Sequence, residues 1–227
     1  MATLEERVAA LEARAEVCDL MSHYAGMLYR RQFDEIVPQL WSHTQGASVE
    51  EGPFGVYTDR QLQGYFQKRY YVPGAEKTGA LTVLSLTDPH LCVSPDGRCV
   101  RGLWTAFGSE TNVFASAQAP QDAVNADSTL SATIYLTCQQ YEVEFVREDG
   151  TWKIMHLHIY EVYRTPYEKS WAASAQDRLA LDTQRDSVLR FDMGDMPPAA
   201  PTTCHWQYSP NCSAPHFPDW EGSEHNG

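Results

Sequence analysis

The segment 152–163, WKIMHLHIYEVY, carries the densest set of side chains suited to proton transfer. A strand alternates between two faces, so one side should hold Trp152, Ile154, His156, His158, Tyr160 and Val162. Because the first two should face the core, we expect both histidines and Tyr160 to point into a pocket. A neutral imidazole takes up a proton near neutral pH and returns it. A phenol stabilises negative charge that develops on a substrate oxygen.

Two other interpretations of these histidines stay open. Either one is a core histidine whose ring is satisfied by a hydrogen bond. The His-x-His spacing on a strand also occurs in metal sites, but such a site needs a third ligand. No acidic residue or histidine is obviously placed to supply that ligand, so the sequence predicts no metal. It predicts a functional role for at least one of His156 and His158.

Tyrosines of the first helical segment are further candidates. Tyr24 continues the apolar side of the helix, which makes it a pocket residue or a core aromatic with a satisfied hydroxyl. The adjacent His23 cannot share its face and belongs at an edge. Tyr29 is expected deeper in the pocket or at a subunit edge.

Two charged residues are weaker candidates for substrate binding. Glu51 shares a strand face with Val49, but Gly52-Pro53 follows at once and favours a solvated turn residue. Arg69 could grip a phenolate or carboxylate, although a surface salt bridge is the favoured interpretation. The remaining binding candidates are Trp104, Tyr141 and, ranked lower, His90.

Helices are expected first and strands afterwards. Residues 3–31 form one long helix, with Thr3 and Glu6 resembling a capping box. A narrow stripe with spacings of four and three holds Leu4, Val8, Leu11, Ala15, Cys18 and Ser22. A narrow stripe packs on one partner helix, and the wider apolar face from Leu20 packs on a domain. The helix is therefore expected to begin at a subunit contact and end in the core.

The rest of the chain predicts two more helices and a run of antiparallel strands. The helices are expected at about 33–41 and at 58–70, with a strand and turn within 47–57. Strands are expected at 81–93, 99–107, 130–146 and 151–164, joined by turns at 94–97 and 148–150 and a loop at 108–128. This order predicts an α+β fold with helices on one side of a sheet. Residues 1–170 should form this domain, and 171–227 a C-terminal extension ending in a Pro- and aromatic-rich arm.

Composition narrows the classes of function. The 227 residues include 17 Lys and Arg against 30 Asp and Glu, a net charge of −13, which argues against nucleic acid and anionic membranes as partners. No long apolar run or secretory signal is present, so a cytoplasmic location is expected. The six cysteines show no metal spacing, and free thiols are expected, Cys204 and Cys212 included. The 26 aromatic residues suggest a large core, a lined cavity, or both.

Several short motifs together resemble the SnoaL-like branch of the nuclear transport factor 2-like (NTF2-like) superfamily. They are CDLMSHYA at 18–25, FDE at 33–35, GVYT at 55–58, PDGRCVRGLW at 95–104 and EDGTWKIMHLH at 148–158. Two positions depart from the family pattern. Tyr29 stands where many relatives carry an acidic residue, and Leu84-Ser85 where many carry a histidine. The stretch 163–171 is most similar to the longer branch that contains lyases of lignin-derived aromatics.

The resemblance implies a cone-shaped α+β barrel with an apolar pocket and no metal or organic cofactor. It favours a lyase that removes water or a small carbon fragment from a hydroxylated aromatic or polycyclic molecule. His156 or His158 would then act as base and acid, Tyr24 and Tyr160 would bind the charged oxygen, and Trp206 or Trp220 of the arm would close the pocket. An isomerase or cyclase, or a binding or assembly domain without catalysis, are the alternatives. A homodimer or higher homo-oligomer is expected.

Overall fold

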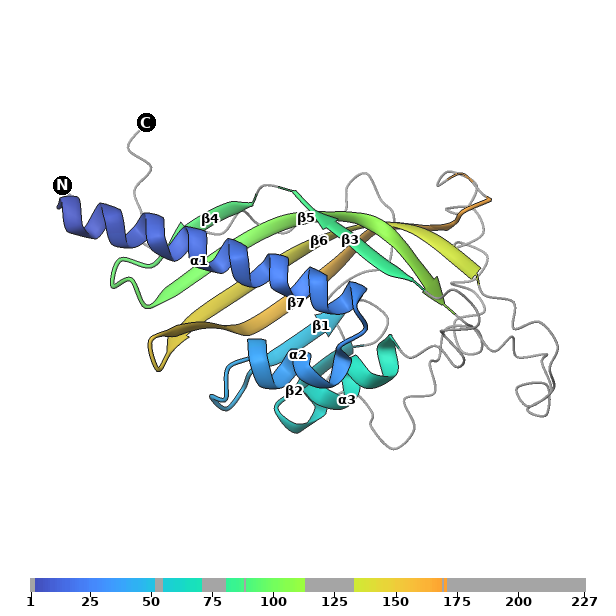
Figure 1. The fold of residues 1–227 in the computed structure, drawn as a ribbon, viewed down its shortest axis with the longest axis horizontal. Coiled ribbons are helices and arrows are strands. Elements are labelled where there is room, and N and C mark those ends of the chain that lie inside the picture. The colour runs from blue at the N-terminus through green and yellow to red at the C-terminus, as the bar shows by residue number, and fades with distance from the viewer. Residues whose placement is uncertain are drawn as a thin grey trace.

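Helices precede most of the strands along the chain, as Figure 1 shows. The computed structural model describes residues 3–51, 55–70, 81–87, 89–112, 133–168 and 170. The helices are α1 (Leu4–Tyr29), α2 (Phe33–Leu40) and α3 (Arg60–Arg69). The strands are β1 (Ser48–Glu51), β2 (Gly55–Thr58), β3 (Thr82–Leu86), β4 (His90–Val93), β5 (Cys99–Asn112), β6 (Thr133–Glu148) and β7 (Thr151–Pro166).

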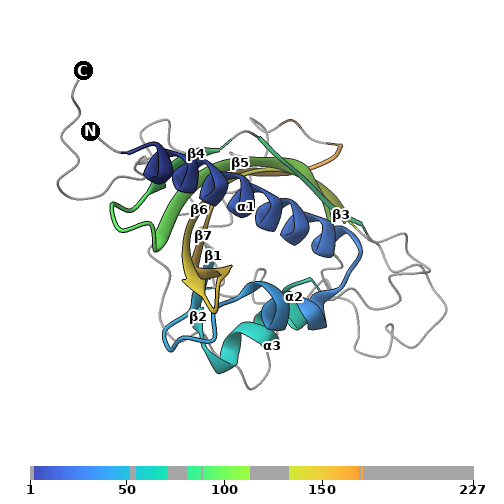
Figure 2. The same cartoon turned by 60° about the vertical axis from the view of Figure 1, so that its left-hand side comes forward.

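The strands form one curved sheet that does not close into a full barrel. Its order is β2-β1-β7-β6-β5-β3, and β4 pairs with β5 beside β3. All pairings are antiparallel except that of β1 with β7, which is parallel. The sheet is thus mixed, whereas the sequence predicted antiparallel strands. The predicted α+β class, with helices packed against the hollow of a cone-like sheet, is confirmed (Figure 2).

Helix α1 crosses the concave side of the sheet and contacts β3, β4, β5 and β7. It begins with the predicted capping box, in which the Thr3 hydroxyl accepts from the Glu6 amide while the Glu6 carboxylate accepts from the Thr3 amide. Its buried side chains include Val17, Met21 and Tyr24. No helix within the described ranges is long and apolar enough to span a bilayer.

The sheet wraps a core that is rich in aromatic rings. The Tyr24 ring lies with its centroid 6.0–6.3 Å from those of Trp41, Phe66 and Tyr141. Such edge-to-face contacts between rings stabilise a core beyond the area they bury. The first and third helices are therefore joined to the middle of the sheet through Tyr24.

Strand β7 changes face twice, because its pairing with β6 is interrupted by two irregularities. Ile154 pairs with Phe145 and His156 with Glu144, which leaves Met155 as an extra residue. The second shift leaves Val162 unopposed in the same way. An extra residue of this kind reverses the alternation of side chains beyond it. The inward residues are consequently Trp152 and Ile154 before the first bulge, and Leu157 and Ile159 after it.

Two element boundaries differ from expectation. The predicted strand at 81–93 is divided into β3 and β4, both of which pair with β5. Strand β5 continues to Asn112, five residues into the segment expected to be a loop. The proposed extension at 171–227, with its Trp206 and Trp220, lies outside the described residues and stays a prediction.

Candidate active site

A buried ion pair joins β1 to α3 inside the cone. Glu51 is 3% exposed and Arg69 is 1% exposed. The Arg69 Nε donates to Glu51 Oε2 and its Nη2 donates to Oε1, each at 2.8 Å. The Tyr65 hydroxyl donates a short hydrogen bond to the same Oε2. Both oxygens of Glu51 are thus occupied, and the expectations of a solvated turn residue and a surface salt bridge are wrong.

A second buried carboxylate, Glu110 of β5, lies between two arginines. Arg164 Nη2 donates to Glu110 Oε2 at 2.5 Å, and Arg69 Nη2 lies 3.4 Å from the same oxygen. Glu161 adds a third carboxylate, 4.0 Å from Arg164 Nη1. Glu110 Oε1 is buried and has no hydrogen-bond partner in the described part of the chain. One carboxylate oxygen in this network therefore retains lone pairs that no protein donor uses.

Four buried phenols surround the two carboxylates, contributed by Tyr24, Tyr65, Tyr70 and Tyr141. Burial raises the pKa of all four well above the ordinary value, and the charges of Glu51 and Glu110 raise those of Tyr24, Tyr70 and Tyr141 further. For Tyr65 the second cause is Glu51. Phenols with raised pKa stay neutral and act as hydrogen-bond donors.

The Tyr24 hydroxyl differs from its neighbours in its bonding. Tyr65 donates to Glu51, and Tyr141 donates to the Gln139 side chain at 2.9 Å. The Tyr24 hydroxyl is buried and makes no hydrogen bond of normal length within the described residues. The Tyr70 phenol nevertheless lies close enough to raise its pKa. The Tyr24 hydroxyl thus has the Tyr70 phenol as a neighbour but makes no hydrogen bond of normal geometry to it.

The charge balance of the cluster keeps its groups ionised. Burial acts to raise the pKa of Glu110, but Arg164 and Arg69 together bring it below the usual value of 4.5. Burial would lower the pKa of Arg69, but the two glutamates raise it well above its usual value instead. At neutral pH the interior therefore holds carboxylates and guanidiniums in contact, surrounded by neutral phenols.

The two histidines do not reach this interior, because the bulge at Met155 turns them to the outer face of the sheet. His156 is exposed, and its Nδ1 lies 2.8 Å from Ser48 Oγ. His158 is half-buried and stacks on Tyr160 with ring centroids 3.9 Å apart. The prediction that both histidines and Tyr160 point into a pocket is wrong.

Carboxylates surround His158 and Tyr160 on that outer face. His158 Nε2 lies 3.5 Å from Glu50 Oε1, and the Tyr160 hydroxyl donates to Glu142 at 3.0 Å. Burial lowers the pKa of His158, while Glu50 and Glu142 counteract the shift. No group of three His, Cys, Asp or Glu suited to a metal ion occurs among the described residues.

The other predicted residues divide between core and surface. Tyr141 is buried beside Tyr24, within the cluster. Trp104 is also buried, but it packs on Phe145 with ring centroids 5.8 Å apart rather than on the carboxylates. Tyr29 is 56% exposed and His90 is exposed, so neither lies in the interior.

Sequence reasoning missed several members of the cluster. Glu110 was assigned to a loop, although continuing the alternation of Trp104 and Ala106 places it on the inner face. Arg164 follows the second bulge, so no regular alternation predicts its side. Tyr65 precedes Arg69 by four residues on α3, so helical spacing gives a usable signal for it, whereas Tyr70 follows the end of the helix.

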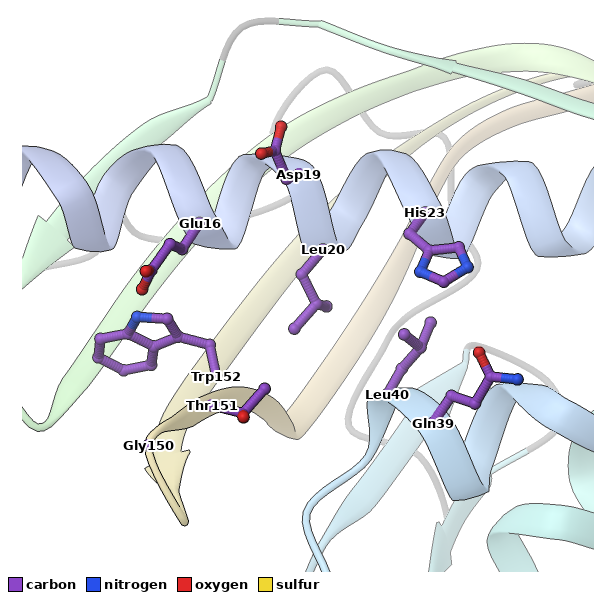
Figure 3. A pocket seen from close by; sticks show the side chains of 9 residues that line it. All are labelled: Glu16, Asp19, Leu20, His23, Gln39, Leu40, Gly150, Thr151 and Trp152. Atoms are coloured by element: carbon purple, nitrogen blue, oxygen red, sulfur yellow. The ribbon is translucent and has the colours of Figure 1, made fainter.

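A separate groove of about 490 Å³ opens between α1, α2 and the β6–β7 turn (Figure 3). Its lining shares no residue with the carboxylate cluster and consists of Glu16, Asp19, Leu20, His23, Gln39, Leu40, Gly150, Thr151 and Trp152. Glu16, Asp19 and His23 are exposed. The groove is open, and none of the residues predicted for chemistry lines it.

Comparison with known proteins finds similar solved structures but no similar family or curated sequence. No family model and no curated protein sequence matches the chain. The crystal structure of LinA aligns with a TM-score of 0.52 and 17% identity, over 70% of this chain and 92% of that chain. Hexachlorocyclohexane dehydrochlorinase LinA-type3 from Novosphingobium barchaimii LL02 gives a TM-score of 0.51 and 17% identity, over 70% and 93%. The type 2 enzyme gives 0.50 and 19%, over 70% and 92%.

At such identities the likeness establishes the fold. The chain has the cone-like α+β fold of these structures, which agrees with the fold that the sequence motifs predicted.

Proposed function

We propose that this protein is a lyase that works by acid–base chemistry inside the cone. Its substrate would be a hydroxylated aromatic or polycyclic small molecule, from which water or a small carbon fragment is eliminated. In this proposal the reacting groups are Glu110 and Tyr24, in place of the histidines that the sequence favoured. The reaction requires neither a metal nor an organic cofactor.

The proposal is carried by two of the buried polar atoms that have no hydrogen-bond partner among the described residues, one an acceptor and one a donor. Glu110 Oε1 and the Tyr24 hydroxyl are both buried without a hydrogen-bond partner in the described part of the chain. The charge of Glu110 contributes to the raised pKa of Tyr24, so the two groups lie in one electrostatic environment. A buried polar group without a partner costs about 1–3 kcal/mol, which favours folds that avoid it. An acceptor and a donor left in this state together suit a ligand that bonds to both.

An elimination assigns one role to each group. The ionised Glu110 Oε1 accepts a proton from a substrate carbon, and the electrons of that C–H bond form the new double bond. The bond to the leaving hydroxyl breaks as its oxygen takes the Tyr24 proton and departs as water, and the proton gained by Glu110 then returns the Tyr24 phenol to its neutral form. Such proton transfer by positioned side chains contributes about 10²–10⁴-fold to a rate.

The remaining charged groups position the reacting ones. Glu51 is unsuited to act as the base, because Arg69 and Tyr65 occupy both of its oxygens. Arg164 and Arg69 hold Glu110 ionised and fix its orientation through Oε2. Two guanidiniums so close to the reacting carboxylate also offset the negative charge that develops on the substrate.

A protein of the same fold supports an elimination. The name hexachlorocyclohexane dehydrochlorinase denotes loss of hydrogen chloride from its substrate. Removing a proton and a leaving group from neighbouring carbons is the chemistry that a base and a donor in one cavity carry out. The substrate of the present protein is proposed from its aromatic interior and not from that name.

The test is turnover of a panel of hydroxylated aryl and polycyclic compounds, followed by mass spectrometry. A product lighter than its substrate by one water or by a small carbon fragment supports the lyase. A product of unchanged mass would assign an isomerase or cyclase to the same residues, and no turnover across the panel would favour the binding domain.

Variants then locate the chemistry. Glu110→Gln should lower kcat by at least 100-fold, whereas the double change His156→Gln and His158→Gln on the outer face should leave it within about twofold. Thermal unfolding identifies any variant that fails to fold, and Tyr24→Phe serves as the second interior variant in that event. Loss of activity only in the histidine variant would overturn the assignment.

A further inference from the structure

Helix α1 carries a second apolar stripe on the side that faces away from the sheet. The stripe holds Leu4, Val8, Leu11, Ala15, Cys18, Ser22, Ala25 and Tyr29, separated alternately by four and three residues. Leu4 is 72% exposed, Leu11 66% and Tyr29 56%. The buried stripe runs through Val17 and Tyr24 on the nearly opposite side of the helix. No described helix or strand lies in front of α1 in Figure 1.

The spacing of this outer stripe is that of a coiled-coil seam. With Val8 at heptad position a, the d positions hold Leu4 and Leu11. A β-branched residue at a with leucine at d favours two parallel strands. The pattern continues with smaller residues, Ala15 at a and Cys18 at d. The first two heptads therefore supply the apolar contact, and the later ones allow close approach.

The charges beside the seam select one orientation of a partner helix. The e positions hold Glu5, Glu12 and Asp19, and the g positions hold Arg7 and Arg14. In a parallel pair of identical helices, Arg7 faces Glu12 of the second copy and Arg14 faces its Asp19. In an antiparallel pair e faces e and g faces g, so like charges meet. Charge complementarity thus favours a parallel pair of α1 helices from two copies of the chain over an antiparallel pair.

We propose that two copies of this chain associate through the outer stripe of α1 as a parallel, in-register pair of helices. This surface is independent of the carboxylate cluster, so it stands whether or not the proposed function does. Arg14 also donates to the Leu91 carbonyl at 2.6 Å, which holds its side chain beside β4. The Arg7–Glu12 pair is therefore the better contact to test.

Sedimentation equilibrium of the full chain tests the proposal, with Leu11→Glu as the first variant. The wild type should be a dimer at tens of micromolar, and Leu11→Glu should raise its dissociation constant at least tenfold. Because Leu11 is largely exposed in the single chain, thermal unfolding of dilute protein should stay unchanged. A monomeric wild type, or a dimer that Leu11→Glu leaves intact, would overturn the proposal.

A charge exchange distinguishes this interface from any other. Arg7→Glu and Glu12→Arg should each weaken self-association, because each places like charges opposite one another. An equimolar mixture of the two variants should form a heterodimer, since both contacts then join opposite charges. A mixture that stays as monomeric as its components would contradict a parallel pair.

Discussion

Arginine and glutamate side chains deep in the cone are held by one another. A buried ion pair gains little net stability over apolar residues, because both charges lose their hydration. Removing one partner is nevertheless costly, since the other charge stays buried alone. Arg69, Glu110 and Arg164 are each at most 6% exposed, so this asymmetry applies to them.

We therefore expect Arg164→Met to destabilise the fold by about 3–5 kcal/mol at neutral pH. A matched control is Arg101→Met, which breaks the half-exposed pair of Arg101 with Glu144 at 2.8 Å. Exposed pairs contribute about 0–1 kcal/mol, so this control should change little. Urea unfolding measures both, and equal losses would contradict a tightly coupled interior.

The same cluster should make the free energy of unfolding decrease at acidic pH. Because the pKa of Glu110 is lower in the folded chain than its usual 4.5, its contribution is present above that value and is lost as the pH falls through the lowered pKa. Arg164 is one cause of the lowered pKa of Glu110. In Arg164→Met that pKa should therefore be higher, and the stabilising contribution of Glu110 should begin to be lost at a higher pH. Urea midpoints between neutral pH and pH 3 test this shift, which Arg101→Met should not show.

On the outer face, His158 should make stability fall at mildly acidic pH. Burial lowers its pKa below the usual 6.5, so the unfolded chain takes up the proton first. Stability is then full above about pH 6.5 and declines as the pH falls towards the lowered pKa. In His158→Gln the decline between pH 7 and 5 should be smaller. Melting temperatures across this range measure it, and parallel curves for both proteins would refute the assignment.

At the scale of elements, close packing of strand β5 depends on its glycines, and Gly102 is the one whose contact involves a side-chain ring. A Cβ at Gly102 would overlap the Trp104 ring, which lies across that residue on the inner face. Gly102→Ala should therefore destabilise the fold by about 1–3 kcal/mol. Gly26 of α1 is the matched control, because its added Cβ would meet only the flexible end of Arg30 at 3.1 Å.

Gly26→Ala should stabilise the helix by about 0.5–1 kcal/mol, since alanine loses less backbone entropy than glycine. Urea unfolding measures the change in the free energy of unfolding for both Gly→Ala variants. Changes of opposite sign would show that the packing around each glycine decides whether alanine stabilises the fold. A neutral Gly102→Ala would mean that the Trp104 ring is free to move aside.

The bulges of β7 explain most of the difference between the expected and observed sites. Apolar periodicity identified the helices, the final hairpin and the inward Trp152 and Ile154. An extra residue in a strand leaves no mark in composition, so the faces of His156 and His158 were inverted. Glu51 was placed on the correct face with Val49, and its burial became visible only with Arg69 opposite it. The pairing depends on segments far apart in sequence, which local patterns do not specify.

For the molecule as a whole, the two apolar faces of α1 serve different contacts. One face closes the cone over the carboxylate cluster, and the other is proposed to join a second copy. The sequence predicted a subunit contact at the start of this helix, which stays a prediction until association is measured. The cone-like α+β fold was predicted correctly from short motifs, because the fold determines the order in which such motifs follow one another along the chain.

Comparison of Tyr24→Phe with the wild type tests the central claim most directly. The change removes one buried hydroxyl that makes no hydrogen bond of normal geometry to a described residue, so the free energy of unfolding should stay equal or rise by about 1 kcal/mol. On a substrate identified from the panel, kcat should nevertheless fall by at least 100-fold. A stable Tyr24→Phe protein with undiminished kcat would contradict an active site inside the cone.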